Sequence, residues 1–287
     1  MSYYKVLGFE REPFSTSPDP AFLYLANDHQ TALINTIIEL RLRRGLSVIL
    51  GDVGTGKTTL SRKLVQELSD RDDFIFNIVL DPSFENEKSF LEYLARNYDI
   101  SYPADANVMV LKETLEKFLF QKGAVENKIV VLIVDEAQKL SGNSLEAMRI
   151  LLNYETNEFK LFQLVLLGQL ELHTKIMNMP NFFDRISFKY TLNPLSREET
   201  KEMIEFRIRT AGYKSNMHLF LGEAVDEIYS YTKGYPRRIM MLCHAALKDL
   251  IMKKKMVVDA RLVGEIIKSE VKSGWEVLNH QLQKENY

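Results

Sequence analysis

The sequence predicts an α/β protein in which a parallel β-sheet, covered by helices on both faces, is followed by an all-helical domain. Three observations predict this fold. Five short apolar segments lack polar alternation and are separated by stretches of helical periodicity, a pattern typical of parallel strands buried on both faces. A glycine-rich turn, GDVGTGKTT, joins the first of these strands to a helix. After Asn193-Pro194-Leu195 the strand pattern stops and only helical segments remain.

The individual elements follow from periodicity and from stop signals. The five predicted strands cover residues 46–50, 75–80, 129–134, 163–167 and 188–192. Apolar residues at helical spacing between Ala32 and Leu40 predict a helix before the first strand, ended by Gly45. A second helix is expected over residues 58–68, directly after the glycine-rich turn.

The C-terminal third of the chain predicts four helices. Ser196 and Glu199 form a capping box that opens the first of them, and Gly212 closes it. Three more helical segments lie near residues 219–232, 236–252 and 260–272. We therefore expect an α/β domain over residues 1–194 with an N-terminal strap over 1–28, a helical lid domain over 195–274, and a loosely packed tail over 275–287.

Composition excludes several classes of protein. The 287 residues carry a formal net charge of −2, so overall charge does not drive the chain onto nucleic acid or an anionic membrane. A single cysteine, Cys243, excludes an internal disulfide and lies in an apolar series typical of a buried residue in a reducing compartment. The N-terminus lacks signal-peptide features and no apolar run reaches the length of a membrane span, so we expect a cytoplasmic protein.

The glycine-rich turn matches the complete P-loop pattern, G-x4-G-K-T, between a buried strand and a helix N-terminus. Its glycines let successive backbone N–H groups face a phosphate, and the helix dipole adds positive potential there. Lys57 is expected to reach the β- and γ-phosphates of ATP, and the Thr58 hydroxyl to ligate Mg²⁺. The predicted nucleotide-binding residues of this loop are Gly51, Asp52, Val53, Gly54, Thr55, Gly56, Lys57, Thr58 and Thr59.

Two carboxylates follow the buried strand at 129–134. Asp135 and Glu136 would stand at its carboxyl end, where open α/β sheets bind their ligands. Asp135 is expected to bind Mg²⁺ directly or through water. Glu136 is expected to orient and deprotonate the attacking water. Together with the P-loop, these residues predict hydrolysis of a nucleoside triphosphate.

The order of motifs resembles an AAA+ ATPase, in which a five-stranded sheet of order 5-1-4-3-2 is followed by a helical lid. That resemblance implies roles for three more residues. Gln169, at the end of the fourth strand, would be sensor 1, although many relatives carry Asn, Ser or Thr there. Arg185, before the last strand, would be an arginine finger reaching a neighbouring subunit. Arg237, in Gly234-Tyr-Pro-Arg237, would be sensor 2, with Arg238 as the adjacent alternative.

Within this class the chain is similar to the general secretion pathway protein A family. The similarity rests on the N-terminal Tyr-Phe-Pro-Phe pattern and on four further motifs: Ser17-Pro-Asp-Pro20, Asp135-Glu-Ala-Gln138, Leu151-Leu-Asn-Tyr-Glu-Thr156 and Leu166-Leu-Gly-Gln169. It implies a homo-oligomer, of which a ring is one form. This oligomer would work with a membrane-anchored partner in envelope assembly and would be recruited to the inner membrane face. The transmembrane and peptidoglycan-binding parts of longer relatives are missing here, which leaves either a cytosolic fragment or a stand-alone relative.

Two local interpretations remain open from the residues alone. The proline-rich aromatic strap is either an ordered cover on the sheet or a wall for the adenine base. Asp81, where relatives tend to carry Asn, is either a polar switch residue near Glu136 or part of a turn that ends a strand.

Two other functions compete with an envelope-assembly ATPase. A DNA-binding AAA+ regulator of the transposition or replication-initiator type would use the basic run Lys253-Lys-Lys255 beside Arg261, and its affinity would fall steeply with salt. The alternative without DNA binding is that this basic run forms a solvated loop between two helices. An ATP-loaded scaffold with negligible turnover is disfavoured by Glu136.

Overall fold

The computed structural model describes residues 3–17, 19–215 and 217–272. The chain divides into two compact units. Residues 27–193 form an α/β unit, and the chain before Asn27 and after Asn193 forms a helical unit. The predicted tail, 275–287, lies outside the described residues.

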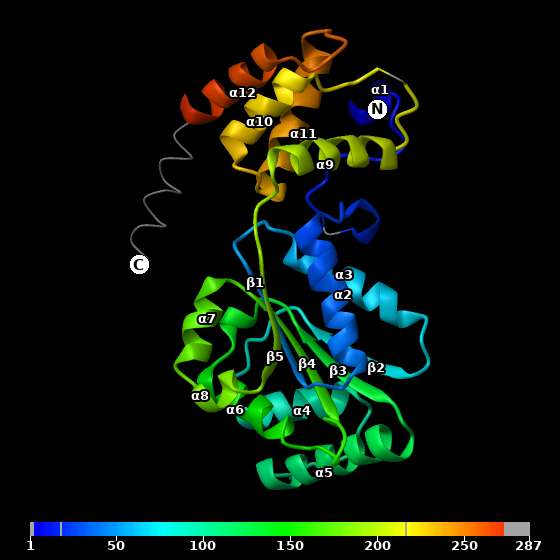
Figure 1. Ribbon diagram of the computed structural model, residues 1–287, viewed down its shortest axis with the longest axis vertical. Helices are drawn as coiled ribbons and strands as arrows, with labels where there is room; N and C mark the ends of the chain where they lie inside the picture. Colours follow the sequence, from blue (N-terminus) through cyan, green and yellow to red (C-terminus); the bar gives the residue numbers. More distant parts are fainter. Residues whose placement is uncertain (1–2, 18, 216, 273–287) are drawn as a thin grey trace. The chain divides into compact units, whose positions relative to one another are not determined.

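The α/β unit is built on one all-parallel sheet of five strands (Figure 1). Its strand order, β2-β3-β4-β1-β5, confirms the expected order 5-1-4-3-2. The central strands β3 and β4 are buried along their whole length, as their unalternating apolar sequences predict. The strands are β1 (Leu46–Gly51), β2 (Phe74–Val79), β3 (Ile129–Val134), β4 (Phe162–Gly168) and β5 (Ile186–Leu192).

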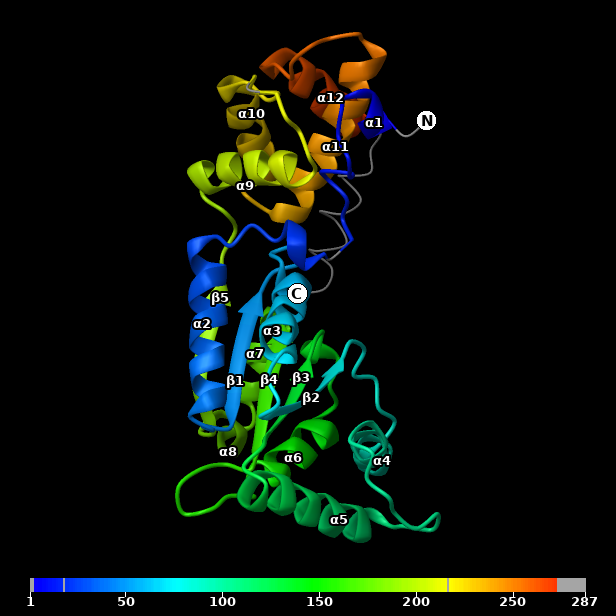
Figure 2. The same cartoon turned by 90° about the vertical axis from the view of Figure 1, so that its right-hand side faces the viewer.

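Helices cover both faces of this sheet, and Figure 2 shows α2 running alongside β1. The α-helices of the unit are α2 (Asn27–Arg41), α3 (Lys57–Ser69), α4 (Glu87–Asn97), α5 (Val108–Phe120), α6 (Gly142–Leu151), α7 (Leu170–Met177) and α8 (Pro180–Phe183). A short π-helix, η2 (Gln121–Val125), extends α5, and a 3-10 turn, η3 (Ala137–Lys139), follows β3.

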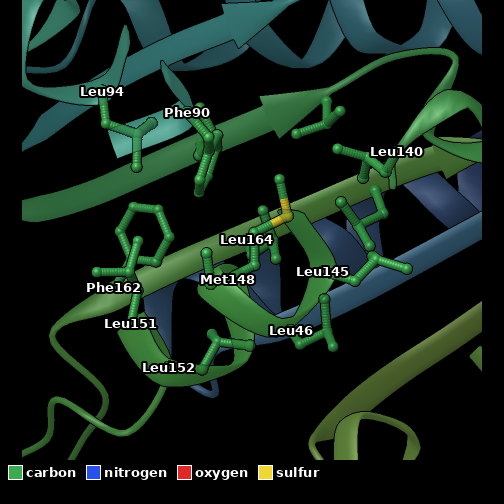
Figure 3. Packing of buried hydrophobic residues seen from close by; sticks show 14 of the residues in the cluster. Leu46, Phe90, Leu94, Leu140, Leu145, Met148, Leu151, Leu152, Phe162 and Leu164 are labelled. Carbon is green, nitrogen blue, oxygen red and sulfur yellow. The ribbon is translucent and has the colours of Figure 1, made fainter. Parts of the chain in front are cut away.

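Successive strand residues point to opposite faces and enter different cores. On one face, Leu46 and Leu164 pack with Phe90 of α4 and Met148 of α6 (Figure 3). On the other face, neighbouring strand residues such as Val165 pack against α2 and α3. The sheet is therefore held rigidly between two apolar layers, and the loops at its carboxyl edge project from a fixed platform.

The helical unit contains four long helices around one core, and Cys243 is buried there as expected. Ser196 and Glu199 form the predicted capping box at the start of α9. The elements of this unit are α1 (Tyr3–Val6), η1 (Pro20–Phe22), α9 (Arg197–Thr210), α10 (Gly222–Thr232), α11 (Pro236–Met252) and α12 (Ala260–Lys272). No helix in the described ranges combines the length and the apolarity that crossing a bilayer requires.

The N-terminal segment packs in the helical unit, whereas the sequence suggested that it would belong with the sheet. Phe9, Phe14 and Phe22 are buried in the core of α9–α12. The guanidinium of Arg207 in α9 donates to the backbone carbonyls of Pro13, Ser15 and Phe22 at 2.8–2.9 Å. The strap therefore contributes to the core of the helical unit, because its aromatic side chains and carbonyls find their partners there.

Candidate nucleotide-binding site

The P-loop turns from β1 into α3 at the carboxyl edge of the sheet. Gly54 and Gly56 adopt φ angles of 83° and 101°, in the left-handed region that glycine enters without strain. Gly56 is the N-cap of α3 and carries no side chain that could fill the capping position. The N-terminal N–H groups of α3 are therefore available to an anion, and the helix dipole favours negative charge at the same place.

Lys57 lies inside this turn. Its side chain is buried, and its Nζ donates to the carbonyls of Gly51 at 2.8 Å and Asp52 at 2.9 Å. Burial lowers the pKa of Lys57, while the carboxylates of Glu136, Asp135 and Asp52 act in the opposite direction. An ammonium group has three N–H donors, so Lys57 can keep these two carbonyls and also donate to a phosphate oxygen.

Asp135 and Thr58 meet beside Lys57. Asp135 is 2% exposed at the end of β3, and its carboxylate hydrogen-bonds with the Thr58 side chain and with the backbone N–H of Glu136. Burial raises the pKa of Asp135, although these hydrogen bonds and Lys57 oppose the rise. The structure thus brings together the two side chains that the sequence predicts for Mg²⁺.

Glu136 follows with φ of 51°, a left-handed conformation that is uncommon for a residue with a side chain. Its Oε2 accepts a hydrogen bond from Gln138 Nε2 at 2.7 Å. The other end of the same amide, Gln138 Oε1, accepts from the backbone N–H of Gln169 at 3.1 Å. Gln138 therefore connects the proposed general base with the end of β4.

Gln169 is the residue immediately after β4 and the N-cap of α7. The structure brings its backbone to the Asp135–Gln138 segment through Gln138. No contact of its side-chain amide is described, so its assignment as sensor 1 stays a prediction.

The residues of the loop fit a bound Mg-nucleotide. A Cβ built on Gly51 would come within 2.7 Å of Thr55 Oγ1, and one on Gly56 within 2.9 Å of His29 Nε2, so both positions require glycine. Backbone N–H groups and Lys57 suit phosphate, and the oxygens of Thr58 and Asp135 suit Mg²⁺. When bound, Mg²⁺ would neutralise charge on the phosphate oxygens.

Arg185 lies at the opposite edge of the sheet from the P-loop. It precedes β5, whose first residue, Ile186, pairs with Leu46 at the start of β1, whereas the P-loop follows Gly51. At about 3.3 Å per residue, the length of β1 separates the two edges by about 17 Å. Arg185 therefore lies away from the nucleotide site of its own chain.

The Arg185 side chain is half-buried beside Glu146 of α6. Its charge helps to lower the pKa of Glu146, after the larger effect of the hydrogen bonds from Arg149. Among the described residues, Arg185 Nε is buried and has no hydrogen-bond partner. Glu146 is already engaged by Arg149 through two hydrogen bonds of 2.7 and 2.8 Å.

The predicted lid arginine, Arg237, is exposed in the first turn of α11 and belongs to the helical unit. Its neighbour Arg238 stacks its guanidinium over the ring of Tyr235, 5.3 Å from the centroid. The assignment of Arg237 to sensor 2 therefore remains a prediction.

Asp81 takes part in a turn. It is exposed after β2 and accepts hydrogen bonds from Ser83 Oγ at 2.8 Å and Lys139 Nζ at 3.3 Å. These contacts favour the strand-ending turn over the alternative of a polar switch residue.

Two residues with contacts at the site were not assigned roles from sequence. Gln138 belongs to a motif of the family resemblance, and His29 precedes the apolar series that predicts the first helix. The imidazole Nε2 of His29 lies 2.7 Å from the carbonyl of Thr55 in the P-loop. No local pattern could reveal this contact, because 26 positions separate the two residues along the chain.

Comparison with known proteins agrees with this geometry. Residues 40–176 match the AAA domain family. The chain is 34% identical over 247 residues to General secretion pathway protein A of Aeromonas hydrophila, a match that covers 85% of this chain and 44% of that protein. The chain spans half or less of the length of the curated relatives it matches.

Solved structures share the fold at low sequence identity. The Aeropyrum pernix ORC2 protein in its ADPNP–ADP complexes is 18% identical with a TM-score of 0.64, covering 90% of this chain and 71% of that chain. The Drosophila ORC bound to DNA is 18% identical with a TM-score of 0.67, covering 94% of this chain and 66% of that chain. This likeness concerns the fold. Combined with the complete P-loop and the Asp135-Glu136 pair, the comparisons identify residues 40–176 as an AAA domain of the P-loop type, in a chain that is similar to General secretion pathway protein A.

Proposed function

We propose that the protein hydrolyses Mg-ATP at interfaces between copies of itself, and that turnover drives assembly or remodelling of a bacterial envelope machine for type II secretion, pili or polysaccharide export. The envelope role rests on the 34% identity to General secretion pathway protein A. A membrane-anchored protein is the partner that this role requires, and the inner membrane face is where the two would meet.

Hydrolysis is assigned to the chain's own residues as follows. Lys57 and the N–H groups of the P-loop hold the phosphates, while Thr58 and Asp135 hold Mg²⁺. Glu136 orients a water molecule and accepts its proton, held in position by Gln138. Gln169 and Arg237 are proposed as additional contacts to the γ-phosphate.

The position of Arg185 carries the interfacial part of the proposal. A guanidinium at the edge of the sheet away from its own P-loop can assist hydrolysis only when a second copy presents it to a neighbouring site. Arginine fingers contribute about 10³- to 10⁵-fold to the rates of related reactions. The ATPase rate per chain should therefore rise with protein concentration.

Mixing two inactive variants tests this arrangement. Arg185→Ala should bind ATP but lose turnover, because it supplies no finger to its neighbour. Glu136→Gln should also lose turnover, because it lacks the base. In a mixture, a Glu136→Gln chain supplies Arg185 to the intact base of an Arg185→Ala chain, so part of the ATPase rate should return. Lys189→Ala, which alters another basic side chain on β5, is the matched control and should keep full turnover.

Two outcomes would contradict this proposal. One is a rate per chain that does not change with concentration, and the other is a mixture as inactive as its components.

The DNA-binding alternative receives less support from the structure. Lys253 contacts Asp249 and Glu265, Lys255 contacts Asp259, and Arg261 contacts Glu265. These acidic partners offset the basic run from which DNA binding was suggested. We therefore retain the envelope-assembly ATPase as the proposed function.

A further inference from the structure

The first turn of α2 joins the two ends of the α/β unit. The unit begins at Asn27 and ends at Asn193, so the chain enters and leaves it at these positions. Asp28 Oδ2 accepts hydrogen bonds from the backbone N of Asn193 at 3.1 Å and from its side-chain Nδ2 at 2.9 Å. Asp28 Oδ1 accepts from the Tyr190 hydroxyl at 2.9 Å. The entering and leaving segments are thus hydrogen-bonded to each other.

The charge of Asp28 suits this contact. Burial acts to raise the pKa of Asp28, but the hydrogen bonds from Asn193 and Tyr190 outweigh it and the pKa is lowered. The carboxylate is therefore ionised at neutral pH, where charge-assisted hydrogen bonds are stronger than neutral ones.

The next residue, His29, contacts the P-loop. It is 2% exposed, and its Nε2 lies 2.7 Å from the carbonyl oxygen of Thr55. A carbonyl oxygen accepts only, so Nε2 carries the proton and donates it. A Cβ at position 56 would lie 2.9 Å from Nε2, so the imidazole fits because residue 56 is glycine. Adjacent residues of one helical turn thus hold the P-loop and the two ends of the unit.

We propose that Asp28 and His29 are positioning residues that couple nucleotide occupancy of the P-loop to the order of the segments entering and leaving the α/β unit. The inference rests on the proposed nucleotide binding. A nucleotide that fixes the Thr55 peptide also fixes the imidazole, the first turn of α2 and, through Asp28, Asn193. Linkage is reciprocal, so weakening the Asp28–Asn193 contact must weaken nucleotide binding.

Hydrogen–deuterium exchange of the full chain, with and without ADP and Mg²⁺, tests this coupling. In the unmodified chain, ADP should slow exchange in the P-loop at 51–59 and in the leaving segment at 190–193. In His29→Leu, ADP at saturating concentration should still protect the P-loop but should no longer protect residues 190–193. His29→Gln keeps an N–H donor and should restore part of that protection. His173→Leu, the same substitution at an exposed histidine, is the control and should behave as the unmodified chain.

Fluorescent-ADP titration provides the reciprocal measurement. Asp28→Ala should weaken ADP binding by about fivefold or more, although the Asp28 hydrogen bonds described above go to Tyr190 and Asn193 and not to the P-loop. Unchanged affinity in Asp28→Ala, or ADP-dependent protection of 190–193 that persists in His29→Leu, would overturn the coupling while leaving nucleotide binding intact. An unmodified chain that binds no ADP would instead overturn the proposed function, and this inference with it.

Discussion

At the residue scale, two carboxylates that follow one strand have different environments. Asp135 is buried among the P-loop side chains, while Glu136 is half-buried in a left-handed turn and is held by Gln138. This difference suits one carboxylate to a cation and the other to a water molecule. The proposed division of roles follows from the position at which β3 ends, because the chain leaves the strand after Val134 and turns at Glu136 in a left-handed conformation.

The raised pKa of Asp135 makes a prediction about stability. The folded chain holds this proton more tightly than the unfolded chain, so above the ordinary pKa of Asp the contribution of Asp135 to stability falls as pH rises toward the raised value. At neutral pH, Asp135→Asn should therefore raise the Tm of the nucleotide-free protein, by about 2–4 °C for each kcal/mol gained. The same variant should lose Mg²⁺-dependent ATP binding.

Differential scanning calorimetry and nucleotide titration check these two effects. The exposed Asp105→Asn is the control and should change neither the Tm nor Mg²⁺-dependent binding. A lower Tm for Asp135→Asn would show that the buried charge is compensated rather than costly.

Gln138 makes a second prediction at this scale. Gln138→Ala removes a hydrogen bond that orients the carboxylate of Glu136, and a loss of about 1.4 kcal/mol in the transition state lowers kcat about tenfold. The KM for ATP should be unchanged, because Gln138 does not belong to the P-loop. Gln138→Glu places a second acidic group beside Glu136 and should shift the acidic limb of the pH–rate profile to higher pH. An unchanged kcat in Gln138→Ala would contradict this positioning role.

At the element scale, α9 organises the N-terminal segment through one side chain. Arg207 is 7% exposed, and burial lowers its pKa to about 10. Its three hydrogen bonds satisfy carbonyls of a segment that has no strand or long helix of its own. One arginine thus supplies the donors for three backbone carbonyls of this segment.

Replacing this arginine should loosen the N-terminal segment. Arg207→Met leaves the buried carbonyls without their donor and should destabilise the protein by about 2–4 kcal/mol. Arg207→Lys should fall in between, because one ammonium group cannot reproduce the planar fork. Chemical denaturation measures the loss, and faster hydrogen exchange over residues 9–15 locates it. Arg209→Met, at an exposed position two residues away on α9, is the control, and an equal effect of both substitutions would refute the role of Arg207.

At the scale of the whole molecule, parallel topology places the proposed catalytic groups at two opposite edges of the sheet. The carboxyl edge carries the P-loop, Asp135 and Glu136, while Arg185 stands at the amino edge. All five strands run in one direction, so a residue that precedes a strand cannot meet residues that follow its neighbours. This separation within one chain is consistent with the proposal that Arg185 of a second copy completes the nucleotide site.

The sequence by itself determined the features that depend on short stretches of chain. All five strands lie within two residues of their predicted limits. The unalternating apolar runs correctly identify β3 and β4 as strands buried on both faces, whereas β5 is buried only at Leu192. The P-loop and the capping box at Ser196 could also be predicted from the sequence, because the positions of the glycines and the spacing of the side chains specify these two motifs locally. The same patterns predicted that Lys57, Thr58 and Asp135 lie close together, because the carboxyl ends of parallel strands share one edge of the sheet.

Only the tertiary structure decided the contacts between distant segments. It placed Phe14 and Phe22 in the helical core, linked Gln138 to the end of β4, and joined Asp28 to Asn193. An aromatic residue can be buried against any apolar surface, and an amide or carboxylate can bond to any suitable partner. Periodicity reports that such groups need partners, whereas their identity depends on which segments the completed fold brings together.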